Sequence, residues 1–334
     1  MDTTETITLT TETKKDWTEV HPRKYIIVPQ NFIKIGYIHL SAFYGIYLCL
    51  TSAKWQTLIF TYICYVVTMI GVTAGAHRLW SHKAYKAKYP LQIILITFLS
   101  MANQRLTHWV RDHRTHHKYS DTDADPHNAS RGFFFSHIGW MFVKKHPLVK
   151  EKGSQISLAD LYQNPVVSFQ HKYAPYMTKF FCFVLPTTVP IYFWGETLNN
   201  SWNINMMRYV LNMHFFFLVN SIAHIWGNKP YNQFIKSVEN KFVTMATLGE
   251  GFHNFHHTFP HDYKSSELGH YTLNYTTAFI DFFAWVGWAY DLRTASPEGI
   301  ARKADRDGDG TRKISNVDDY SNSNQTLIQH SECS

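Results

Sequence analysis

Nine histidines gathered in a few short segments are the residues of this chain best suited to chemistry. They form three tight boxes and one outlier: His77 and His82; His113, His116 and His117; His253, His256 and His257; and His224. Imidazole is the commonest metal-binding side chain near neutral pH, and a single zinc ion is satisfied by about four ligands. Nine clustered imidazoles therefore predict two metal ions.

The spacing within each box suits helices that face a common site. Residues three and four apart share one face of a helix, so each HxxHH box is expected to aim its histidines together. Asn220 and His224 are related in the same way. His77 and His82 are five residues apart, so their helix must end or distort nearby. A single box is more typical of solvated or capping histidines, but the repetition favours a dinuclear metal centre.

The kind of metal is narrowed by what accompanies the histidines. The HExxH pattern of zinc hydrolases is absent from the sequence. All-imidazole ligation suits iron, copper, zinc or nickel, and iron is the first choice for oxygen chemistry beside a membrane. Carboxylates are expected to orient the far ring nitrogens. The candidates are Asp112, Asp121, Asp123, Asp125, Glu250 and Asp262.

Long apolar windows predict an all-α integral membrane protein. Four windows approach the ~20 residues that cross a bilayer core, and they come as two close pairs: residues 32–51 and 55–76, then 178–198 and 206–226. The alternative is four buried core helices of a soluble protein. The paired arrangement favours the membrane, with short connectors on one side of it.

The charge distribution predicts the orientation of these spans. The net charge is +7, and Lys and Arg gather between the two pairs and near both termini. By the positive-inside rule, both termini and a helical cap (77–177 and 227–303) are cytosolic. Topology thus explains the basic charge without nucleic acid. Polar composition predicts disorder over 1–24 and 304–334, which leaves 25–303 as the membrane domain.

The boxes also carry a family resemblance. HRLWSH, HRTHHKYSDTDADPHNASRGFFFSHIGW and GEGFHNFHHTFP resemble the integral-membrane acyl-CoA desaturases, the stearoyl-CoA desaturase family, from about Asn31 to Leu292. The tetrad Lys236–Glu239 stands where moth pheromone-gland members have a diagnostic signature. Without the family it would read as a solvated loop. The resemblance implies a Δ11 double bond, with possible formation of a 10,12-diene.

The same resemblance implies the fold, cofactors and partners. It implies four transmembrane helices under a cytosolic cap in the endoplasmic reticulum membrane. Two irons would be held by the nine histidines, with Asn220 reaching one iron through water. O2 would be the co-substrate. Electrons would come from a separate cytochrome b5, supplied by NAD(P)H-cytochrome b5 reductase.

Family positions further imply how a fatty acyl-CoA sits, with its head on the cytosolic surface and its chain in a kinked tunnel. Gln104 and Phe217 depart from the vertebrate Asn and Trp. Tyr65 and Met69 match the closed end of the tunnel. The positions matching substrate contacts are Asn31, Gln104, Arg111, Asp112, Lys144, Lys145 and Phe217.

The expected reaction is insertion of a cis double bond into a saturated or monounsaturated acyl-CoA. A Δ9 desaturase and a fatty acyl hydroxylase are the alternatives among enzymes, because histidine-box iron sites serve each. A membrane metal-binding or transport protein is the alternative from another class. It predicts histidines inside the spans, whereas eight of the nine lie outside the predicted spans and only His224 lies within one.

Overall fold

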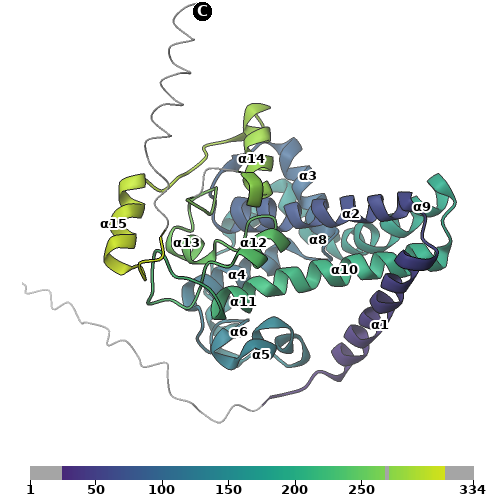
Figure 1. Ribbon diagram of the computed structural model, residues 1–334, viewed down its shortest axis with the longest axis horizontal. Helices are drawn as coiled ribbons and strands as arrows, with labels where there is room; N and C mark the ends of the chain where they lie inside the picture. The colour runs from purple at the N-terminus through teal and green to yellow at the C-terminus, as the bar shows by residue number, and fades with distance from the viewer. Residues whose placement is uncertain (1–24, 268–270, 313–334) are drawn as a thin grey trace, which may run out of the picture.

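The computed structural model describes residues 25–267 and 271–312, which are almost entirely helical (Figure 1). The first half comprises α1 (Pro29–Thr51), α2 (Trp55–Ile70), η1 (Gly71–Ser81), β1 (Lys86–Ala87), α3 (Tyr89–Ser100), α4 (Leu106–Tyr119), η2 (Ala129–Arg131), α5 (Phe133–His137), η3 (Gly139–Phe142), α6 (Pro147–Ser154) and α7 (Ala159–Tyr162). The second half comprises α8 (Pro165–Lys179), η4 (Phe180–Val184), α9 (Leu185–Trp194), α10 (Leu198–Asn220), α11 (Ile222–Ile225), α12 (Lys241–Ala246), α13 (His253–Thr258), η5 (Tyr271–Leu273), α14 (Tyr275–Trp285), β2 (Ala289–Tyr290) and α15 (Pro297–Asp307).

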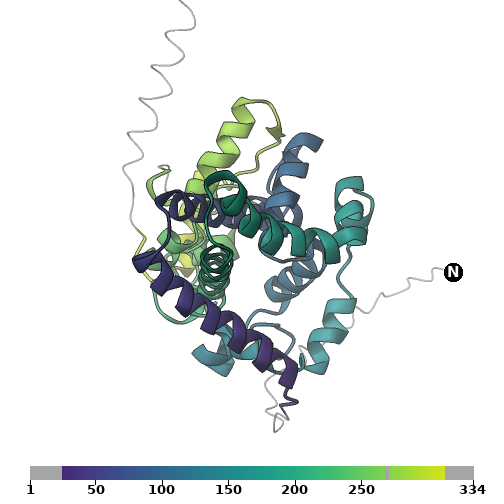
Figure 2. The same cartoon turned by 90° about the vertical axis from the view of Figure 1, so that its right-hand side faces the viewer.

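Three long helical segments form the frame of the molecule. In Figure 1, α2 and α10 run across its middle, and α1 lies at the lower right, packed against α10; Figure 2 gives the view from that side. Gly45 lets α1 approach closely, because a Cβ there would lie 2.3 Å from the backbone oxygen of Asn203. Much of α1 remains exposed and apolar, with Ile33 75% and Leu50 83% accessible.

Two helices among the described residues are long and apolar enough to cross a membrane. They are Pro29–Thr51 and the continuous helix Trp55–Ser81. They coincide with the first two predicted spans. The second runs five residues beyond the predicted end at 76, and this extension carries His77 into the site described below.

This extension belongs to the π-helix η1, which explains how His77 and His82, five residues apart, can face the same site. The backbone N–H of His82 donates to the carbonyl of His77 at 3.2 Å, an i→i+5 bond of the kind that defines a π-helix. The predicted distortion is thus confirmed. Gly71 serves close packing here, since a Cβ would lie 2.3 Å from the backbone nitrogen of Leu99 on α3.

The last two predicted spans differ from the helices observed. The third predicted span, 178–198, falls in a helical run that continues without a break from α8 through the π-helix η4 to α9, begins at Pro165 and ends at Trp194. Pro186 and Pro190 lie in this stretch, and proline removes an i→i−4 hydrogen bond from a helix. The fourth predicted span, 206–226, is shifted. Helix α10 begins eight residues earlier and ends at Asn220, and α11 follows after a break at Ser221.

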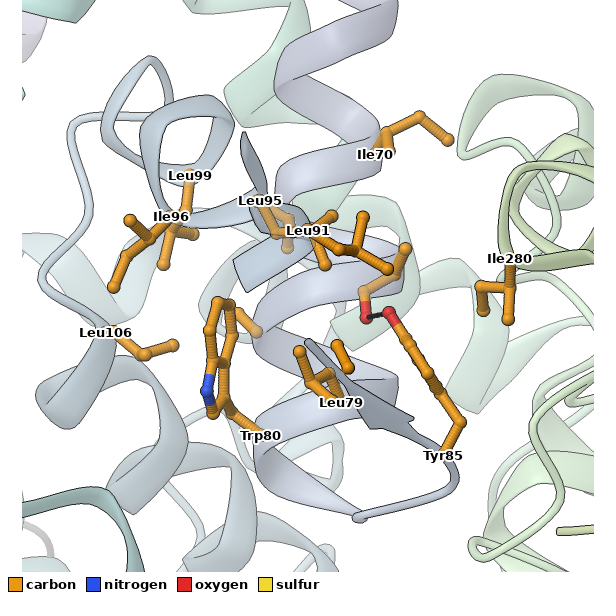
Figure 3. Close-up of a cluster of buried hydrophobic side chains, with 14 of the residues drawn as sticks. Ile70, Leu79, Trp80, Tyr85, Leu91, Leu95, Ile96, Leu99, Leu106 and Ile280 are labelled. Carbon is orange, nitrogen blue, oxygen red and sulfur yellow. Dashed lines mark hydrogen bonds between the residues drawn. The ribbon is translucent and has the colours of Figure 1, made fainter. Parts of the chain in front are cut away.

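The hydrophobic core lies between η1, α3, α4 and α14. Leu91, Leu95 and Leu99 on α3 are fully buried against this assembly (Figure 3). The hydroxyl of Tyr85 is satisfied within it by the carbonyl of Ala74 at 2.8 Å. The core therefore holds η1, with His77 and Ser81, rigidly beside the start of α4.

The C-terminal boundary also differs from the prediction. Helix α15 runs to Asp307 and is capped by the Ser296 side chain, which accepts from the Gly299 N–H at 3.1 Å. The predicted boundary after residue 303 therefore falls within a helix. The predicted disordered segment 1–24, and residues 313–334 of the predicted disordered segment 304–334, lie outside the described residues.

Candidate metal centre

All nine box histidines meet in the interior, in two adjacent groups. We call them cluster A and cluster B. Within each cluster, one ligand-type nitrogen per histidine lies within 4.8 Å of every other. Cluster A is His77, His82, His113, His117 and His256, and cluster B is His116, His224, His253 and His257.

Each HxxHH box is shared between the two clusters, which corrects the expectation of one common site per box. On α4, His113 and His117 belong to cluster A, whereas His116 belongs to cluster B. On α13, His256 belongs to cluster A, whereas His253 belongs to cluster B. Residues i and i+4 lie directly above one another, while i+3 is displaced around the helix. Two helices facing each other in this way build two sites side by side.

The distances between histidine nitrogens suit metal ligation. In cluster A, His256 Nε2 lies 2.9 Å from His77 Nε2 and 3.0 Å from His117 Nε2. In cluster B, His253 Nε2 lies 3.0 Å from the Nε2 atoms of both His224 and His257. Two nitrogens about 2.1 Å from one ion and at right angles would be ~3.0 Å apart. The convergent Nε2 atoms therefore match the geometry of shared ligands.

Three carboxylates fix the orientation of one histidine each. Glu250 Oε2 accepts from His77 Nδ1 at 2.7 Å, and Asp125 Oδ2 accepts from His116 Nδ1 at 2.9 Å. A neutral imidazole carries a single N–H, and a carboxylate only accepts. The Nε2 atoms of these rings are therefore bare lone pairs directed into the clusters. The third pair is His224 Nδ1 with Asp121 Oδ2, at 3.1 Å.

Of the six predicted orienting carboxylates, Asp121, Asp125 and Glu250 thus contact box histidines. Asp112 instead pairs with Lys145 and with Arg111, the latter at 3.2 Å. Asp262 accepts backbone N–H groups of Lys264 and Ala295. These two carboxylates therefore bond to groups other than the nine histidines.

Burial and neighbouring charges shift the pKa values of the histidines and carboxylates of the site. Burial lowers the pKa of six imidazoles well below the ordinary value: His82, His113, His117, His253, His256 and His257. Burial also opposes charge on Asp125, but the charge of His116 outweighs it and lowers the pKa of Asp125 to about 2. His77 and Arg78 likewise lower the pKa of buried Glu250 to about 2. Six of the nine imidazoles are thus favoured as neutral nitrogen donors. Burial also opposes charge on His116, but Asp125 outweighs it and raises the pKa of His116.

A cavity of about 210 Å³ borders both clusters. Its wall includes His77 and His113 from cluster A and His116 and His253 from cluster B. Four of the predicted residues also line it: Gln104, Asp112, Phe217 and Asn220. Apolar side chains such as Val72 and Met213 make most of the remaining wall. A chain of methylenes could lie in such a space with one part beside the histidines.

Sequence reasoning missed several cavity residues. Trp109 stacks on His113 with ring centroids 4.8 Å apart. His127 packs edge-on against Trp140 at 4.5 Å, and its backbone N–H donates to Asp125 Oδ1 at 2.9 Å. The sequence did offer a reason to consider His127, because it falls inside the histidine-rich stretch 113–140. It lies outside the HxxHH spacing and so went unassigned.

Of the predicted charged substrate contacts, Asp112 lines the cavity, whereas Arg111, Lys144 and Lys145 are not among its lining residues. Lys145 pairs with Asp112, which itself lines the cavity. Lys144 is exposed nearby. Asn31 Nδ2 donates to the carbonyl of Met141, another lining residue, at 2.6 Å. Positive charge is therefore brought to the cavity wall at Asp112, which pairs with both Arg111 and Lys145.

The two residues predicted at the tunnel end do not line this cavity. Met69 is fully buried in the hydrophobic core, and Tyr65 donates through its hydroxyl to the carbonyl of Ala246 at 2.6 Å. Asn212, which does line the cavity, donates to the backbone carbonyl of Tyr65 at 3.2 Å. Tyr65 thus lies directly behind a wall residue, and Met69 is one helical turn away from it along α2.

Asn220 and His224 are related differently from the prediction of one continuous helix. Helix α10 stops at Asn220, and the break at Ser221 redirects the chain into α11. Asn220 still faces the cavity, and His224 still joins cluster B. The break therefore separates a wall residue from a ligand only four positions later.

Comparisons with known proteins agree with this geometry. Residues 53–290 match the family model described as fatty acid desaturase. The chain is 58% identical over 291 residues to an acyl-CoA Δ11 desaturase of Choristoneura rosaceana, with 87% of each chain covered. It is 54% identical over 299 residues to the (11Z)-hexadec-11-enoyl-CoA conjugase of Bombyx mori, covering 89% and 91%. Human stearoyl-CoA desaturase 5 is 50% identical over 287 residues, covering 85% and 86%.

These matches define the class of protein. The chain belongs to the fatty acid desaturase family and is an oxidoreductase enzyme of lipid metabolism. The predicted family resemblance is thereby confirmed.

Proposed function

We propose that this enzyme is an acyl-CoA Δ11 desaturase of pheromone biosynthesis that holds two irons in clusters A and B. The observation that carries the proposal is the single cavity that borders both clusters, with charged residues gathered near Asp112 at one end. The reaction would consume acyl-CoA, O2, two electrons and two protons. It would yield a cis double bond and two waters.

The residues present fit the metals. Nine imidazoles, three of them oriented by carboxylates, form a donor set that suits iron. When bound, the two irons would supply redox activation of O2. Cluster A would offer five ligands and cluster B four, with Asn220 near enough on the cavity wall to join cluster B through water.

The protein's own residues would hold the substrate in register. Arg111, Lys144 and Lys145 would bind the phosphates of coenzyme A as charge-assisted donors. Asn31 would fix the η3 backbone beneath the head group, since it bonds Met141. Gln104 and Phe217 would contact the acyl chain at the cavity wall. Selective removal of hydrogen from one methylene pair needs placement to within ~1 Å, which a rigid apolar wall provides.

Regiochemistry rests on the relatives. Two relatives share more than half of the aligned residues with this chain: one is named a Δ11 desaturase and the other a conjugase of an 11-enoyl-CoA. Both activities are consistent with Lys236–Glu239 at the signature position. We therefore propose Δ11 desaturation first and a conjugated 10,12-diene as a possible second product. A Δ9 enzyme is the nearest alternative, as the Acheta domesticus relative named acyl-CoA Δ9 desaturase is 52% identical.

The membrane arrangement follows the sequence pattern. We propose four spans in the endoplasmic reticulum membrane with both termini cytosolic, contributed by α1, α2, the α8–α9 segment and α10. Exposed apolar side chains on α1 support contact with lipid. Cytochrome b5, reduced by its NAD(P)H-dependent reductase, would deliver electrons from the cytosolic side.

The test is expression in a desaturase-deficient yeast supplied with saturated acids of different lengths. Mass spectrometry would locate the double bonds in the products. An alkene at carbon 11 is expected, and an alkene at carbon 9 would replace the Δ11 assignment. Hydroxylated product without alkene would favour a fatty acyl hydroxylase.

A metal transporter or storage protein is the candidate from another class. It would bind metal without converting acyl-CoA. The family match and the cavity beside the clusters argue against it. Two metals per chain with no turnover, in the presence of cytochrome b5 and its reductase, would favour it.

A further inference from the structure

The tetrad Lys236–Glu239 is buried at its two central residues and connects two parts of the candidate metal centre. Ser237 is 1% and Val238 2% accessible, so the tetrad is not the solvated loop that its residues alone would predict. It lies between α11, which carries His224, and α12. The chain then leads through Gly251 to α13, which carries three histidines.

One side of the tetrad holds α11. The backbone N–H of Val238 donates to the carbonyl of Ala223 at 2.7 Å. Ala223 is fully buried and immediately precedes His224. Glu239 pairs with Asn228 just beyond this helix, donating its N–H to the Asn228 carbonyl at 2.7 Å. The tetrad backbone thus fixes the segment that presents His224.

The other side holds α13. Glu239 Oε1 accepts the backbone N–H of Phe255 at 2.9 Å, and the Ser237 carbonyl accepts Asn254 Nδ2 at 2.9 Å. The first N–H groups of a helix have no partners within it. Helix α13 has six residues, so it depends on outside contacts to keep its place. Glu239 also forms a backbone bridge with Phe252, at the start of α13.

The clusters depend unequally on these two helices. Cluster B takes three of its four histidines from α11 and α13, namely His224, His253 and His257. Cluster A takes one of its five, His256. Displacement of α13 would therefore leave cluster A with four of its five histidines and cluster B with two of its four, and displacement of α11 as well would leave cluster B with His116 alone.

We propose that Glu239 is a positioning residue for cluster B, tying α13 to the α11 segment so that His224, His253 and His257 converge. The inference rests on the proposed two-metal function and adds the means by which one cluster is held. Burial raises the pKa of Glu239 to about 8, so a neutral side chain of the same length should do the same work.

The test measures metal per purified full-length chain in detergent for Glu239→Ala and Glu239→Gln. The Ala variant removes the acceptor for Phe255 and should fall from two metals to about one. The Gln variant keeps an accepting oxygen and should retain two. Glu298→Ala, which removes an exposed carboxylate on α15, is the matched control and should also retain two.

Each outcome separates the two proposals. A wild-type chain that binds no metal would overturn the proposed function itself. Wild type and Glu239→Ala both holding two metals would overturn only the positioning role. Loss of both metals together in a folded Glu239→Ala chain would also overturn it. If Glu239→Ala does not fold, Glu239→Asp can be used, because it shortens the side chain by one methylene. It should selectively lower the occupancy of the metal site in cluster B.

Discussion

Replacement of Glu250 by Gln should weaken cluster A even though the side chain keeps its size. Glu250 accepts from His77 Nδ1 through Oε2, and from Arg78 Nη2 through Oε1 at 2.9 Å. A glutamine has one oxygen and one NH2 group. In either orientation its NH2 faces a donor. It either opposes buried Arg78 or forces the N–H of His77 onto Nε2, which blocks the ligating lone pair.

Two magnitudes follow from these contacts. Loss of a partner that orients a metal-bound histidine typically lowers metal affinity 10–100-fold, which is about 1.4–2.7 kcal/mol. Breaking a buried ion pair costs about 3–5 kcal/mol of folding stability. Arg78 keeps contacts to Tyr263 and Lys264 carbonyls, at 2.8 and 3.1 Å. The loss of stability should therefore fall at the lower end of that range.

The assay separates the two effects. Metal content would be measured during dialysis against graded chelator, and unfolding would be followed by heating in detergent. Glu250→Gln should release about one metal at 10–100-fold lower chelator strength and should melt earlier than wild type. The double variant Arg78→Met/Glu250→Gln removes the unpaired charge and should recover stability but not metal affinity. Wild-type metal retention in Glu250→Gln would refute the assignment of Glu250 as the partner of a ligand.

Three other predictions test separate parts of the molecule. Hydrogen bonds from Arg114 and Lys83 overcome burial and lower the pKa of Asp160 from 3.8 to about 2. The stability that this carboxylate contributes should be present above pH 3.8 and lost as the pH falls towards 2. Asp160→Asn should flatten this part of the melting-temperature profile, and an unchanged profile would contradict the assignment. His116→Ala should abolish desaturation in yeast while membrane insertion, measured by fractionation, persists; retained turnover would remove His116 from the ligands. Met69→Ala should raise activity on longer acyl chains if the predicted tunnel extends past the Tyr65 region, and an unchanged chain-length profile in a stable protein would reject that idea.

The sequence predicted that the nine histidines gather at one place, but not that they divide into two clusters. The nine histidines and three of the orienting carboxylates were identified from spacing and proximity alone. Spacing along one helix shows which side chains share a face, but not which partners that face meets. The split of each HxxHH box into clusters A and B arises because α4 and α13 face each other across the site. That relation depends on contacts between segments about 140 residues apart.

The helices were predicted best where their composition was uniform. The first two spans are strongly apolar and appear as long helices. The third contains Pro186 and Pro190, and it appears as the π-helix η4 followed directly by α9 within one continuous helical run. In the fourth, the polar residues Asn200 and Asn205 looked like a connector but are buried in α10, where Asn205 Nδ2 donates to the Cys182 carbonyl at 3.0 Å. A polar side chain can extend a helix into the interior when a partner awaits it, and the local sequence does not reveal that partner.

The surroundings of the cavity residue Asn212 explain why the preferred substrate length cannot be predicted from single sequence segments. Asn212 donates to the Tyr65 carbonyl, while its Oδ1 lies 3.4 Å from Arg208 Nη1. Arg208 is itself fully buried and donates to the Cys182 and Met101 carbonyls. A wall residue is therefore held by a polar network that spans α2, α3, η4 and α10. Because an unpaired polar group in such a place is costly, the network resists displacement by an acyl chain. In the proposed complex, the room for the acyl chain would be set by how these elements pack around Arg208, and the histidines would determine only where along that room the chemistry occurs.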